Sequence, residues 1–216
     1  MIEQLSLKWD QLDKLYQDHG ETPELLFQMY ECADELIAGC IRQGKLTEAK
    51  TRAEEATSIG GEIVRMFAPE EFSNEQNMSF GPHRDLPFSS GPYAHRPIDI
   101  ARRLVFLECL CATQHIADDD IGDPLNGHVY RAREHALKVV QENSEYARAI
   151  QREFNDNSEL LRELFQHPAT KDHALELLEG DLTKLKLEEG FSEEPGSEND
   201  GPDEQFDNKD KVDDAV

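Results

Sequence analysis

Proline and glycine divide this chain into segments in which apolar residues recur every three or four positions, and this pattern constrains its fold most. Side chains at that spacing fall on one face of an α-helix. The first segment shows the pattern in a stripe formed by Ile2, Leu5, Trp9, Leu12 and Tyr16. We therefore predict a first helix that runs to His19 and stops at Gly20.

The next two segments predict a pair of antiparallel helices. Thr22 can cap the first of them, Pro23 needs no N–H partner in its first turn, and Glu24 lies near the positive end of its dipole. This helix ends at Gly44, and residues 46–67 predict the next one. The two helices pack antiparallel because only a few residues separate them.

Helical spacing fails from residue 68 to residue 96 and then returns. The segment contains Pro69, Pro82, Pro87, Pro92, Gly81 and Gly91, which exclude a sustained helix or a central strand, so we expect a loop. Residues 97–120 are the most apolar stretch and predict the centre of the core. Three more helices are expected. The first is capped by Asp123, has Pro124 in its first turn and runs to residue 154. The second is capped by Asn157 and Ser158 and ends near His167, and the third spans residues 171–189 and is capped by Thr170.

Beyond Gly190 the sequence is rich in acids and poor in apolar residues, so burial cannot offset the entropy cost of ordering it. We predict an all-α protein of antiparallel helical hairpins stacked as a bundle or short solenoid. Its expected organisation is an N-terminal helical subdomain at 1–67, a loop at 68–96, a C-terminal helical subdomain at 97–189 packed on the first, and a disordered acidic tail at 190–216.

Charge and apolar runs limit the environment and the partners. The formal net charge is −24, which disfavours binding to nucleic acid or anionic lipid and favours a basic partner or a role in solubility. A halophilic host is a further reading of the same charge. No apolar run approaches the ~20 residues that cross a bilayer, and the first residues do not read as a signal peptide. The 4 cysteines lie in apolar helical stretches, which favours a reducing cytoplasm.

Two segments share a pattern of small residues. Gly44, Leu46, Ala49 and Ala53 correspond to Gly127, Val129, Ala132 and Ala136. Alanines at this spacing let two helices approach closely, and the glycine turns the chain between them. In residues 37–56, and in a degenerate second copy near 127–139, the chain resembles the tetratricopeptide family of helix-turn-helix repeats. Gly44, Leu46, Ala49 and Ala56 match that family's turn glycine, turn hydrophobe and packing alanines.

The resemblance implies a stacked helical scaffold that binds peptides in a groove lined by the first helix of each pair. On this reading the groove would be lined by Gln28, Glu31, Glu35 and Arg42. Ala38 stands where carboxylate-binding members of the family place a polar residue, so the resemblance does not imply a clamp for a C-terminal carboxylate. Ala33 replaces the family's large aromatic residue in the first helix, and the spacing between the two copies exceeds the family's ~34 residues.

The predicted loop is the only locally cationic part of the sequence and mixes basic with aromatic residues. The candidate partner-binding residues in it are His83, Arg84, Phe88, Tyr93, His95 and Arg96. Three interpretations stay open: a segment that packs on the helices through arginine–carboxylate pairs, a strap that binds a partner, and a plain linker. A nucleic-acid site is disfavoured because the surrounding acids would cancel so small a patch.

The sequence contains no P-loop, no Gly-x-Gly-x-x-Gly and no Ser nucleophile-elbow motif. Cys111, His115 and Asp118 have a spacing that could place metal ligands on one helix face, but cysteine in "FLECLCA" reads better as a small hydrophobe. His128 and His135 lie seven residues apart on one face, without a His-Glu-x-x-His motif. We therefore predict no catalytic residue, no cofactor and no metal.

Three functional hypotheses follow. The first is an interaction module, a tetratricopeptide-like adaptor or scaffold that binds a peptide or a basic protein through a helical groove. The second is an acidic decoy that imitates nucleic acid and occupies a DNA-binding protein. The third is a helical metal-dependent enzyme. The sequence leaves the identity of the partner and the oligomeric state open.

Overall fold

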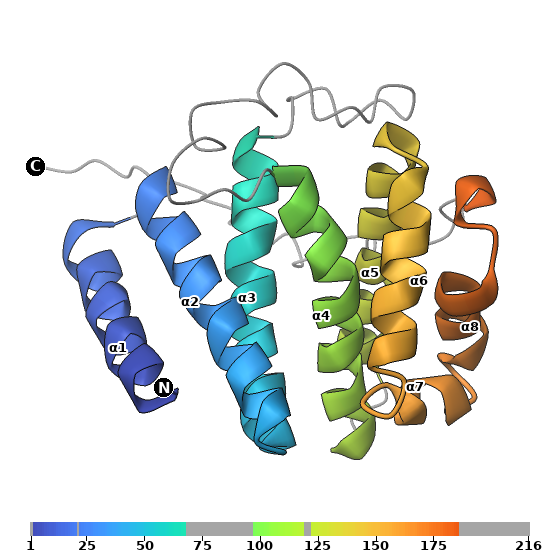
Figure 1. The fold of residues 1–216 in the computed structure, drawn as a ribbon, viewed down its shortest axis with the longest axis horizontal. Helices are drawn as coiled ribbons and strands as arrows, with labels where there is room; N and C mark the ends of the chain where they lie inside the picture. Colours follow the sequence, from blue (N-terminus) through green and yellow to red (C-terminus); the bar gives the residue numbers. More distant parts are fainter. Residues whose placement is uncertain (1, 21, 68–96, 119–121, 186–216) are drawn as a thin grey trace, which may run out of the picture.

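The computed structural model describes residues 2–20, 22–67, 97–118 and 122–185, and within these ranges the protein contains helices and no strands (Figure 1). The predicted all-α class is confirmed. The elements are α1 (Ile2–His19), α2 (Pro23–Arg42), α3 (Leu46–Phe67), α4 (Pro97–Ala117), α5 (Asp123–Glu142), α6 (Glu145–Asp156), α7 (Arg162–Gln166), α8 (Lys171–Glu179) and the short 3₁₀ helix η4 (Leu182–Lys184). No helix in the described residues combines the length and the hydropathy needed to cross a membrane.

The first helical hairpin begins and turns at the residues predicted for it. The Thr22 hydroxyl accepts a 3.3 Å hydrogen bond from the Leu25 N–H at the start of α2, and Pro23 occupies the first turn. Gly20 and Gly44 have φ of +76° and +71°, a conformation that glycine adopts without strain. The turn at Gly44 sends α3 back along α2.

The helices stand side by side, with α1, α2, α3 and α4 in chain order and α5 to α8 beyond them (Figure 1). Close packing joins α2 to α3, α3 to α4, and α4 to α5. The alanines predicted to line the hairpin seams are buried: Ala49 is 1% exposed, and Ala53, Ala132 and Ala136 are 0% exposed. Phe27, Phe106 and Phe154 are among the largest fully buried side chains of the core that runs through the array.

The predicted helix through residue 154 is wrong, because the chain breaks it into α5 and α6. Asn143 has extended backbone angles (φ −151°, ψ 111°), and its side-chain oxygen accepts a 3.0 Å hydrogen bond from the Glu145 N–H. Asparagine competes in this way with the helical hydrogen bonds of its own backbone. The break lets α6 lie against α4, α5 and α8.

The later helix boundaries also differ from prediction. The Asn157 side chain donates a 2.8 Å hydrogen bond to the Glu153 carbonyl, so it closes α6 and does not cap the next helix, which begins at Arg162. The last helix ends at Glu179 and does not reach residue 189, because the chain is extended at Gly180. Thr170 does precede α8, but its hydroxyl donates to the Leu164 carbonyl (2.9 Å) and makes no cap. Gly122, and not Asp123, is the N-cap of α5.

Two adjacent arginines of α4, Arg102 and Arg103, pair with acids of other helices. Nη1 of Arg102 lies 3.0 Å from Oε2 of Glu153 on α6. Arg103 binds the other oxygen of Glu153, and its Nε lies 2.9 Å from Oδ1 of Asp34 on α2. Helix α4 is thereby linked by charge to helices on both sides of it.

Candidate binding grooves

The sequence-predicted site residues divide into two groups. Gln28 and Glu31 on α2 are half-buried, and Glu35 and Arg42 are exposed. None of these four residues lines either of the grooves described below. The other candidates, His83, Arg84, Phe88, Tyr93, His95 and Arg96, lie outside the described residues, as do the predicted loop at 68–96 and the predicted tail at 190–216.

A first groove, here called the acidic groove, runs between α1, α2 and α3 and has a volume of about 540 Å³. Its apolar part includes Trp9 of α1 and Leu26 and Met29 of α2, which are 8%, 2% and 4% exposed. Tyr16 and Ile59 add partly buried apolar surface. The base of the groove is therefore buried core, and Tyr16 and Ile59 supply its more accessible apolar surface.

Carboxylates surround this apolar floor: Asp13, Glu54, Glu55 and Glu62. Glu55 pairs with Arg52 at 2.6 Å, and Glu62 pairs with Arg65 at 2.9 Å. Among the described residues no ion pair reaches Asp13 or Glu54. The Arg52 guanidinium also lies 5.2 Å from the centre of the Trp9 ring, so a cation already occupies part of the aromatic face.

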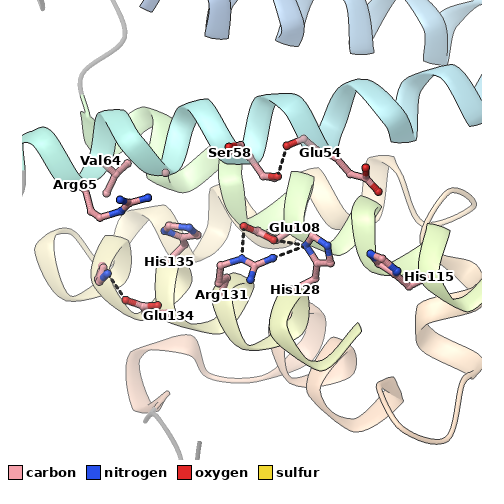
Figure 2. Close-up of a pocket in the computed structure, with 13 residues that line it drawn as sticks. Glu54, Ser58, Val64, Arg65, Glu108, His115, His128, Arg131, Glu134 and His135 are labelled. Atoms are coloured by element: carbon pink, nitrogen blue, oxygen red, sulfur yellow. Dashed lines mark hydrogen bonds and ion pairs between the residues drawn. The ribbon is translucent and has the colours of Figure 1, made fainter. Parts of the chain in front are cut away.

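A second groove, here called the polar groove, is lined by α3, α4 and α5 and has a volume of about 720 Å³ (Figure 2). Helix α3 lines it with Glu54, Thr57, Ser58, Gly61, Val64 and Arg65; α4 with Glu108 and His115; and α5 with His128, Arg131, Glu134, His135 and Lys138. A polar cavity of this size suits a small-molecule ligand. Glu54 and Ser58 line both grooves and form the boundary between them.

Glu108 is the buried centre of the polar groove. Its side chain is 2% exposed, and its two oxygens bind Nδ1 of His128 at 2.6 Å and Nε of Arg131 at 2.9 Å. Burial opposes ionisation of this carboxyl, but the hydrogen bonds from His128 and Arg131 outweigh it and hold its pKa below the ordinary value of 4.5. Glu108 is therefore a carboxylate at neutral pH, with both oxygens satisfied.

This carboxylate decides the tautomer of His128. Nδ1 of His128 also lies 2.9 Å from Nη2 of Arg131, which can only donate. One ring nitrogen cannot donate to Glu108 and accept from Arg131 together, and the contact with the anionic Glu108 is shorter. We therefore assign a proton to Nδ1, which donates to Glu108. The His115 ring stacks on His128 with ring centres 5.1 Å apart.

His135 is buried one helical turn beyond Arg131. It is 7% exposed, and its Nδ1 has no hydrogen-bond partner in the described part of the chain. Burial lowers the pKa of His135 to about 4, so the ring is neutral at physiological pH. A buried polar atom without a partner requires a physical explanation, and a bound water or ligand is the usual one.

Two cysteines, Cys109 and Cys111, lie on α4, the helix that also carries Glu108 and His115. Cys109 and Cys111 are 1% and 0% exposed, and burial raises the pKa of both thiols well above their ordinary value. In the part of the chain that the structure describes, no three or more His, Cys, Asp or Glu side chains are placed to hold a metal ion. Cys111 and His115 belong to one helix, but only His115 lines the groove.

Family models, curated proteins and solved structures give no match to this chain. The grooves therefore have to be interpreted from their own geometry. Sequence reasoning singled out His115, His128 and His135 as histidines on helices, but it missed Glu108 and Arg131. A signal was present, since Glu108 is the only acid in the stretch "LVFLECLCA", and an acid inside a buried helix needs a partner.

Proposed function

We propose that this protein is an interaction module that binds a basic amphipathic helix of a partner protein in the acidic groove. The carrying observation is an apolar floor around Trp9, Leu26 and Met29 with carboxylates on its rim. An amphipathic helix binds by laying its apolar face into such a groove. The resemblance to tetratricopeptide proteins, which implies peptide binding on a helical scaffold, supports the same class of function.

The charge of the groove argues for a basic partner. Asp13 and Glu54 have no counter-ion among the described residues, and the whole chain carries a formal charge of −24. Lysine or arginine at the edge of a bound helix would meet these carboxylates. The field of the protein would also raise the association rate and make it sensitive to salt. Burial of the partly exposed Tyr16 and Ile59 by the bound helix would supply the part of the affinity that persists at high salt.

Trp9 supplies a direct measurement, because it is the single tryptophan of the chain and lies in the groove. The probe is a synthetic amphipathic helix of roughly 18 residues, about five turns, with leucine on one face and lysine on the other. Binding is followed by Trp9 emission and by anisotropy of a dye on the peptide. We expect a change in Trp9 emission, and a loss of affinity in the double variant Asp13→Asn, Glu54→Gln.

The matched control removes the same charges elsewhere. Asp172→Asn with Glu179→Gln changes two exposed acids of α8, away from the groove. If the control weakens binding as much as the groove variant, or if Trp9 emission does not change on binding, the peptide is attracted by net charge alone and the proposal fails. The decoy and the metal-dependent enzyme remain predictions from the sequence.

A further inference from the structure

The charges of the polar groove are exposed unequally. The Arg131 side chain is 46% exposed, while its carboxylate partner Glu108 is 2% exposed. Glu108 cancels the charge of Arg131 from beneath, but a molecule that enters the groove meets the guanidinium and not the carboxylate. Nε of Arg131 donates to Glu108, which leaves the N–H groups of its two terminal nitrogens for other acceptors.

Further cations line the same groove. Arg65 of α3 is 72% exposed and pairs with Glu62, and Lys138 of α5 pairs with Glu134. In Figure 2, Arg65, Glu134 and His135 lie toward one end, Arg131 lies near the middle beside Glu108, and Glu54 and His115 lie toward the other end. Glu54 is eleven residues from Arg65 on α3, about 16 Å at 1.5 Å per residue. Glu54 is therefore distant from this end, while Glu134, which lies at this end, is paired with Lys138.

The side of α3 that lines the groove leaves open space next to Gly61. A Cβ built on Gly61 would meet no atom within 4 Å, whereas one on Gly60 would lie 2.8 Å from Leu104 and 2.9 Å from Tyr30. Close packing therefore explains why residue 60 is a glycine, but it does not explain why residue 61 is one. A helix-interior glycine costs roughly 1 kcal/mol relative to alanine. A glycine at this position leaves the α3 backbone accessible to a molecule in the groove.

We propose that the polar groove binds a small organic oxyanion, a carboxylate or a phosphate monoester, between Gly61 of α3 and Arg131 of α5. Arg131 is the main partner, because a guanidinium donates to oxyanions in a fixed planar geometry. Arg65 and Lys138 add charge at the same end, and His135 holds the unpartnered Nδ1 that a ligand or its bound water would satisfy. This site is independent of the helix-binding function proposed for the acidic groove.

The test uses the full-length protein with four probes: inorganic phosphate, AMP, citrate and the dication agmatine. Isothermal titration calorimetry gives affinities, and the ring signals of the histidines in ¹H–¹³C NMR spectra report the place of binding. We expect at least one of the three anions to bind and to shift the His128 and His135 signals, with no such shift from agmatine. Comparison of the affinities for phosphate and AMP with the affinity for citrate shows whether the groove binds a phosphate or a carboxylate.

Three variants locate the site. Arg131→Gln should lower anion affinity about tenfold or more, because it removes a charge-assisted hydrogen-bond donor. Gly61→Leu retains every charge and fills the gap, and it should abolish the shifts while the circular dichroism spectrum stays helical. Arg148→Gln removes an exposed arginine of α6 outside the groove and should change nothing. The proposal is overturned if no anion shifts the His128 and His135 signals, if agmatine shifts them equally, or if Gly61→Leu binds like wild type.

Discussion

Arg103 on α4 donates a 2.9 Å hydrogen bond from Nε to Oδ1 of Asp34 on α2, a residue that lies 69 positions earlier in the chain. Its Nη1 binds Glu153 on α6, so one guanidinium connects three helices that the sequence separates widely. Arg103, Asp34 and Glu153 are 18%, 32% and 15% exposed, so water screens these pairs only in part.

Replacement of Arg103 by methionine should destabilise the fold. Methionine keeps much of the packing of the side chain but leaves Asp34 and Glu153 without their shared cation. We expect the free energy of unfolding to fall by about 2 kcal/mol, below the usual range for a fully buried pair because the partners keep some contact with water. Urea unfolding of Arg103→Met and wild type at neutral pH measures this difference in the free energy of unfolding. Arg148→Met on the exposed face of α6 should change it by less than about 0.5 kcal/mol, and equal losses in both variants would contradict the role of Arg103.

The buried His135 should make stability depend on pH. Its pKa is lowered from the ordinary value of 6.5 to about 4 by burial. Below pH 6.5 the unfolded chain takes up a proton that the folded ring does not accept until about pH 4. The contribution of the neutral His135 ring to the free energy of unfolding is therefore complete above pH 6.5. It is lost as the pH falls from 6.5 to 4, by roughly 3 kcal/mol in total.

His135→Leu removes this titration and keeps an apolar side chain of similar size in the buried position. Urea unfolding from pH 7 to pH 4.5 should give a flatter stability curve for the variant than for wild type. The ring signal of His135 in NMR spectra should titrate near pH 4 in the wild type. A ring that titrates near 6.5 would mean that the pocket is wet, and the predicted slope would then be absent.

The Glu108 carboxylate should also make stability depend on pH, but in a lower pH range than His135. Because its pKa is held below 4.5 in the folded protein, its stabilisation is present above pH 4.5 and is lost as the pH falls through the lower folded value. Glu108→Gln keeps the shape but removes the charge shared by His128 and Arg131. We expect a loss of about 2 kcal/mol at pH 7 that shrinks as the pH is lowered below 4.5. A loss that is constant with pH would show that packing, and not charge, is responsible.

The helices could be predicted because their signals are local. Thr22, Pro23 and Gly44 act within a turn of their own positions, and the apolar stripe of α1 follows from the geometry of a single helix. The break at Asn143 was missed, because the apolar spacing continues through it while the asparagine side chain competes for the backbone. Helix periodicity says which face is buried and does not say where a polar side chain ends the helix.

The grooves could not be predicted in the same way. Glu108 meets Arg131 only because α4 and α5 pack together, and the acidic groove combines residues from α1, α2 and α3. The tetratricopeptide resemblance directed attention to Gln28, Glu31, Glu35 and Arg42, on a face of α2 that lines neither groove. A pattern within one helix gives its buried face, but the exposed face that binds a ligand depends on its neighbours.

The adjacent glycines of α3 permit a test in which one change destabilises the fold and its neighbour stabilises it. Gly60→Ala places a methyl group 2.8 Å from Cδ2 of Leu104 and 2.9 Å from Cε2 of Tyr30, and both of these side chains are buried. The overlap should cost more than the helix propensity that alanine gains, so we expect a net loss of about 1 kcal/mol. Gly61→Ala meets no atom within 4 Å, so only the propensity gain remains and the protein should become more stable by roughly 0.5–1 kcal/mol. Thermal and urea unfolding of the two variants measure both effects against the same wild type.

If Gly61→Ala destabilises the protein, the space beside α3 is already filled in the free molecule, and the glycine then serves packing and not a ligand.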